Sequence, residues 1–194
     1  MCSSDLNCSL VLDILPNIRD WQICASLDGT GPVGEYIRTG LNYEPWVRNF
    51  KEVRTIVRHR RQLRIDFTLT LPGLFEILAI EELAAECDVD ILAKIMFTFS
   101  ADAIFSPLSL PRPLLTKVVN NILPRVRTQA MRDMLNNLLS QQVLQEQYTN
   151  NYAQAMIQGK NRMLQLEQIR QHSVTLSDCL SPDPDVKAWY DNIG

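Results

Sequence analysis

Long apolar runs are missing from this 194-residue sequence, because none approaches the roughly 18 residues that a membrane span needs. A basic excess is also missing: 19 Lys and Arg face 22 Asp and Glu, and a net charge of −3 gives no general attraction to nucleic acid or anionic membranes. The five cysteines are scattered without a C-x-x-C pair, which argues against a disulfide framework or a zinc site. With no secretory signal either, we expect a cytoplasmic protein with reduced thiols.

The composition is that of an ordinary globular protein, with 46% apolar and 21% charged residues. The first six residues, MCSSDL, lack periodicity, and codons that would encode them look like the end of a common sequencing adapter. We therefore expect residues 1–6 to be a non-native leader on a fragment of a longer protein. A short natural N-terminus is the alternative.

The stretch WQICASLDGTGPVGEYIR, residues 21–38, organises the chain. Its apolar run stops at Ser26-Leu27-Asp28-Gly29, and further glycines follow before Arg38. This pattern predicts a buried strand that ends in a polar, glycine-rich turn. Ligands bind where the strands of a parallel α/β sheet end, so the turn is a candidate site. A purely structural turn is equally open on spacing alone, because ordinary turns use the same residues.

Two more strands are predicted, over residues 63–70 and 91–99, with helices over residues 45–59 and 74–86 between them. Strands that alternate with helices at this spacing indicate right-handed βαβ units and an α/β fold with a parallel sheet buried on both faces. The sheet region spans residues 7–112. From residue 113 to residue 194 the composition becomes helical, with one long helix predicted from about residue 125 to 157, Gly159 as its C-cap, and a last helix from residue 160 to 172.

For two charged clusters we favour a structural interpretation over a functional one. The basic residues 58–61 lie at the C-terminus of a predicted helix, where they complement its dipole more often than they bind nucleic acid. Glutamates recur through the helix predicted over residues 74–86, and an outward acidic face is commoner there than a metal or acid–base site.

Four phrases in order resemble the later part of radical S-adenosylmethionine (radical SAM) enzymes of the twitch or SPASM group. They are SLDG at 26–29 with Arg38, VDILAKIMF at 89–97, SPLSLPRPLL at 106–115, and L-x-x-E-x-x-R at 164–170, where the family usually has Asp in place of Glu167. The resemblance implies strands four to six of a partial (β/α) barrel, followed by a helical extension. The residues that it assigns to binding the S-adenosylmethionine cofactor are Ser26, Asp28, Arg38, Thr68 and Met96.

The resemblance also implies individual roles. Ser26 would lie near the ribose or the amino-acid part of S-adenosylmethionine, and Arg38 near its carboxylate. Thr68 or Thr70 would supply the polar contact of strand five, and Met96 would lie near the adenine. A hydroxyl and a guanidinium suit a ribose oxygen and a carboxylate.

A radical SAM enzyme cleaves S-adenosylmethionine at a [4Fe–4S] cluster held by a CxxxCxxC motif, and Cys2 and Cys8 lack that spacing. We therefore expect the cluster ligands only in a full-length parent, no metal site in this chain, and no activity of the chain alone. The catalytic residues are unknown, and the substrate is left open between a peptide and a small molecule. Two alternatives remain: a nucleotide- or phosphate-binding module that uses the loop 28–34, although G-x-G-x-x-G and G-x-x-x-x-G-K-[ST] are absent, and a noncatalytic protein-interaction module.

Overall fold

The computed structural model describes residues 12–98, 100–148, 151–170 and 173–194. The expected leader, Cys2 and Cys8 lie outside these ranges. Over these ranges the chain has an α/β fold with three strands: β1 (Ile23–Ser26), β2 (Leu63–Leu69) and β3 (Asp90–Ile95). The helices are α2 (Gly31–Ile37), α3 (Tyr43–Arg54), α4 (Ile77–Glu86), α5 (Arg112–Ile122), α6 (Gln129–Tyr148), α7 (Tyr152–Arg170), α8 (Leu176–Cys179) and α9 (Pro184–Asp191).

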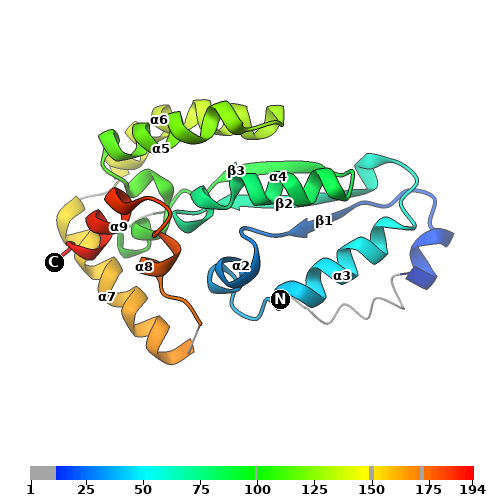
Figure 1. Ribbon diagram of the computed structural model, residues 1–194, viewed down its shortest axis with the longest axis horizontal. Coiled ribbons are helices and arrows are strands. Elements are labelled where there is room, and N and C mark those ends of the chain that lie inside the picture. The colour runs from blue at the N-terminus through cyan, green and yellow to red at the C-terminus, as the bar shows by residue number, and fades with distance from the viewer. Residues whose placement is uncertain (1–11, 99, 149–150, 171–172) are drawn as a thin grey trace.

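The three strands form one parallel sheet in the order β1-β2-β3, which confirms the expected βαβ arrangement. Register pairs Ser26 with Asp66 and Thr68 with Lys94. In β2, alternate residues Ile65, Phe67 and Leu69 are fully buried and join the core with apolar side chains of α3 and α4. Figure 1 shows α4 lying across β2 and β3. Alternation in the sequence thus fixes which face of the sheet meets the helices.

The opposite face of the sheet is more exposed than the sequence predicts. Asp66 and Thr68 are half-buried, whereas Cys24 and Lys94 on the neighbouring strands are exposed and Leu92 is 46% exposed. Lys94 reaches Asp66 across this face, with its Nζ 2.9 Å from Oδ1. Burial of both faces was therefore the wrong expectation for the described residues. The polar members of the alternating β2 pattern already favoured contact with solvent or a polar surface.

The helical part differs from the sequence prediction in three ways. The long helix expected over residues 125–157 is two helices, α6 and α7, and Gly159 is buried inside α7 instead of ending a helix. The helix expected over residues 160–172 is the second half of α7. Helices α8 and α9 were not predicted, although α8 begins with a capping box at Thr175 and α9 with Pro184 after the capping Asp183. Figure 1 shows α7, α8 and α9 gathered beside the C-terminus.

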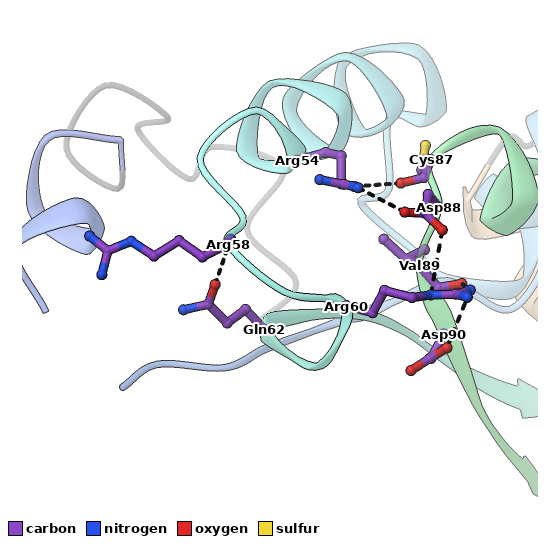
Figure 2. A network of polar contacts seen from close by, with 8 residues as sticks. All are labelled: Arg54, Arg58, Arg60, Gln62, Cys87, Asp88, Val89 and Asp90. Atoms are coloured by element: carbon purple, nitrogen blue, oxygen red, sulfur yellow. Dashed lines mark hydrogen bonds and ion pairs between the residues drawn. The ribbon is translucent and has the colours of Figure 1, made fainter. Parts of the chain in front are cut away.

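Two arginines, Arg54 at the end of α3 and Arg60 of the basic residues 58–61, reach the C-terminal end of α4, as Figure 2 shows. Arg54 Nε donates to the carbonyl oxygen of Cys87 at 2.7 Å, and its Nη2 donates to Asp88 at 3.1 Å. Arg60 lies 3.5 Å from Asp88 and 3.4 Å from Asp90. Cys87 caps α4, so these cations complement the C-terminal end of α4 and the start of β3. The expectation that residues 58–61 complement the dipole of the preceding helix was wrong, because α3 ends at Arg54; Arg60 pairs with carboxylates after α4, and Arg58 donates to the Pro16 carbonyl oxygen.

One glutamate of α4 contradicts the expected outward acidic face. Glu81 is only 3% exposed, and its carboxylate accepts hydrogen bonds from the backbone of Arg127 at 2.9 Å and Thr128 at 2.7 Å, and from the Thr128 hydroxyl at 2.6 Å. These donors lie just before α6, where free N–H groups need acceptors. Glu81 is therefore an internal cap, whereas Glu82 and Glu86 are exposed as expected.

Candidate functional site

The candidate site lies where the three strands end. Ser26 is the last residue of β1, Thr68 is near the end of β2, and Met96 directly follows β3, where its N–H donates to the Leu69 carbonyl at 3.0 Å. The register places Ser26, Thr68 and Met96 on the same face of the sheet, because Cα partners in a parallel sheet share a face. All three are half-buried. Residues 26, 68 and 96, far apart in sequence, therefore share one edge of the sheet.

Asp28 connects Thr68, in β2, to Arg38, the residue that follows α2. It is buried, and its Oδ1 accepts a hydrogen bond from the Thr68 N–H at 2.7 Å. Its Oδ2 lies 2.7 Å from Arg38 Nε in a largely buried ion pair. Strand β1 has already ended at Ser26, so the carboxylate takes the place of a strand carbonyl beside β2. The structure thus links Asp28 to Arg38 and to the Thr68 N–H, and it places Ser26 and Met96, which the resemblance also assigns to the site, at the ends of β1 and β3.

The glycine-rich segment folds more tightly than a simple turn, because α2 begins inside it. Gly29 and Gly34 pack backbone to backbone: a Cβ on Gly34 would lie 2.3 Å from the Gly29 carbonyl oxygen. Gly73 allows a second close approach, since its Cβ would lie 3.1 Å from the Asp28 carbonyl oxygen. Arg38 follows α2, and its N–H donates to the Gly34 carbonyl at 3.0 Å. The glycines therefore permit the compact return of the chain that brings Arg38 back to Asp28.

Glu76 is a residue of this site that the sequence reasoning missed. Its Oε2 accepts hydrogen bonds from the Thr30 N–H at 2.7 Å and the Thr30 hydroxyl at 2.6 Å. A carboxylate here complements the N-terminal end of α2. This arrangement argues against the phosphate-binding alternative, because an anion of the protein already lies where a phosphate would bind. No local signal marks Glu76, which contacts a residue 46 positions away.

The donor groups fit S-adenosylmethionine, which carries ribose hydroxyls, a carboxylate and an adenine. Ser26 and Thr68 provide hydroxyls, and Arg38 provides a guanidinium, a group that suits a ligand carboxylate. Met96 provides a polarisable apolar surface.

An iron–sulfur cluster does not fit the residues that the structure describes. Cys24 is on the sheet, Cys87 follows α4 and Cys179 ends α8. Within the described ranges, no three His, Cys, Asp or Glu side chains form a group that could hold a metal ion. We therefore derive no chemical step through a cluster in this chain.

None of the helices in the described ranges is long and apolar enough to cross a membrane. In comparisons with known proteins, no family model matches the chain, and no curated protein or solved structure matches it significantly.

Proposed function

We propose that this chain is the C-terminal part of a radical SAM enzyme of the twitch or SPASM group. In this proposal, residues 7–112 form strands four to six of the (β/α) barrel, and residues 113–194 form a helical extension. The observation that carries the proposal is that Ser26, Thr68 and Met96 share one face at the carboxyl ends of three adjacent parallel strands, where Asp28 accepts from the Thr68 N–H and pairs with Arg38. Ligands of parallel α/β sheets bind at this edge.

Each side chain has a defined role in the proposed pocket. The Ser26 hydroxyl binds the ribose or the amino-acid part of S-adenosylmethionine, and Arg38 binds its carboxylate. Asp28 orients Arg38 through their 2.7 Å ion pair. Thr68 contributes a polar contact from β2, and Met96 packs on the adenine. When bound, S-adenosylmethionine would be the molecule from which the parent enzyme generates its radical.

The cluster ligands then belong to a segment of the parent enzyme outside this chain. The isolated chain then supplies part of a binding pocket and is inactive by itself. A peptide or small-molecule substrate is compatible with this framework, because fold does not fix substrate.

Titration of the isotopically labelled chain with S-adenosylmethionine, followed by amide chemical shifts, tests this proposal. We expect saturable shifts at residues 26–38, 68 and 96. Ser26→Ala and Arg38→Lys should each weaken binding about tenfold, which is the effect of losing one charge-assisted hydrogen bond of about 1.4 kcal/mol. Arg38→Lys retains a cation for Asp28 but loses the fork geometry. Ser140→Ala, an exposed site on α6, is the matched control and should bind as the wild type does.

Two results would contradict the proposal. One is a titration that leaves the amides of residues 26–38 unshifted. The other is equal binding by the Ser26→Ala and Ser140→Ala variants, which would place the ligand elsewhere. Capture of a protein partner that survives the double substitution Ser26→Ala with Arg38→Ala would favour the noncatalytic interaction module instead.

A further inference from the structure

The C-terminal helices contact α2 through the carboxylate of Glu167 in α7. The hydroxyl of Tyr36, in α2, donates a hydrogen bond to Glu167 Oε1 at 2.7 Å. The N–H of Leu176, the first residue of α8, donates to the same oxygen at 2.6 Å. Glu167 thus joins three helices, whereas its spacing from Arg170 alone is typical of an ordinary surface pair.

The Tyr36 side chain is firmly held in this arrangement. It is 3% exposed, and its ring lies 6.3 Å from that of Phe105. Burial raises the pKa of the Tyr36 hydroxyl, and the hydrogen bond to the Glu167 carboxylate raises it further. The hydroxyl therefore keeps its proton and donates to Glu167.

The last turn of α2 links this contact to the strand ends. Tyr36 lies two residues before Arg38, whose N–H donates to Gly34 at 3.0 Å. The Arg38 side chain then meets Asp28, which holds the Thr68 N–H. A shift of this turn moves the Arg38 Cα relative to β2. The side-chain contact to α7 therefore constrains the position of the guanidinium.

We propose that Glu167 is a positioning residue for Arg38, and that α7 and α8 act through it to set the geometry of the strand-end site. This inference rests on the proposed function for the identity of the ligand, but its mechanical part concerns only this chain. It makes the helical extension a support of the binding pocket. If Glu167 only connected α7 to α8, the hydrogen bond from the Leu176 N–H would be enough. Loss of the Tyr36 hydrogen bond would then leave Arg38 unaffected.

Amide hydrogen exchange of the full chain separates these two roles. Tyr36→Phe removes one donor and keeps the Leu176 bond, so we expect the Arg38 amide to exchange about five- to tenfold faster while the Leu176 amide stays protected. Glu167→Gln keeps an acceptor oxygen and should retain most of the protection, whereas Glu167→Ala should lose it at both amides. Tyr190→Phe is the matched control, because Tyr190 is equally buried but its hydroxyl has no hydrogen-bond partner among the described residues.

The same variants are then titrated with S-adenosylmethionine. Weaker binding by Tyr36→Phe, with unchanged binding by Tyr190→Phe, supports the inference in full. Unchanged Arg38 exchange in Tyr36→Phe overturns it, whatever the ligand result. Faster Arg38 exchange in a chain whose wild type binds no S-adenosylmethionine supports the positioning of Arg38 and refutes the proposed function alone. Because Tyr36→Phe is a mild substitution, the decision does not depend on whether Glu167→Ala folds.

Discussion

The ion pair between Asp28 and Arg38 allows a quantitative test of the site. Only 7% of the Asp28 side chain and 20% of the Arg38 side chain are exposed, and the two charges lie 2.7 Å apart. Asp28→Ala removes the partner of Arg38 and also the acceptor of the Thr68 N–H. Breaking a buried pair costs about 3–5 kcal/mol, so we expect a loss of unfolding free energy in this range. Asp28→Asn keeps an oxygen that accepts from the Thr68 N–H. It should therefore lower the unfolding free energy by about 1–3 kcal/mol less than Asp28→Ala, which is the penalty of one unsatisfied buried donor.

Urea unfolding followed by tryptophan fluorescence measures these losses, and a double-mutant cycle of Asp28→Asn with Arg38→Ala isolates the pair. We expect a coupling free energy of about 2 kcal/mol. Lys51 and Glu86 provide the matched control, because their charges lie 2.6 Å apart but their side chains are 44% and 59% exposed. A surface pair of this kind should couple by less than about 1 kcal/mol. Equal coupling in the two cycles would refute the claim that burial, and not distance alone, makes the Asp28 pair strong.

Two further predictions concern the glycine segment and the thiols. In thermal unfolding, Gly34→Ala should destabilise the fold by about 3 kcal/mol or more, because its Cβ would lie 2.3 Å from the Gly29 carbonyl oxygen. Gly40→Ala, at a φ of +86° in open space, should cost only about 1 kcal/mol. Equal losses of stability in the two variants would contradict the close approach at Gly34. In a variant with Cys2 and Cys8 replaced by Ser, a thiol reagent at neutral pH should label the exposed Cys24 before Cys179. Burial raises the pKa of the Cys179 thiol to about 12, so little of it is the reactive thiolate. Rapid labelling of Cys179 in the folded protein would contradict this and would show that α8 opens readily.

The sequence by itself determined much of the sheet and the positions of the strand ends. The alternation through Ile65 and Phe67 fixed a strand and its buried face, because side chains of a strand point to opposite sides with period two. The run that stops at Ser26 marked a strand end, and parallel topology brought Thr68 and Met96 to the same edge. The strands and their order are local features that a sequence pattern is enough to predict, whereas the choice of Thr68 and Met96 as site residues came from the family resemblance.

Tertiary structure alone decided what the charged and polar side chains contact. Glu76 and Glu81 look alike in sequence, yet one caps α2 and the other the segment before α6, because each lies opposite backbone donors from another part of the chain. Glu167 meets Tyr36 across 131 positions. The end of α6 near residue 148 also escaped prediction, since the hydrophobic pattern alone does not mark it. Long-range packing selects these partners, and the free energy of a buried charge depends on surroundings that no local spacing specifies.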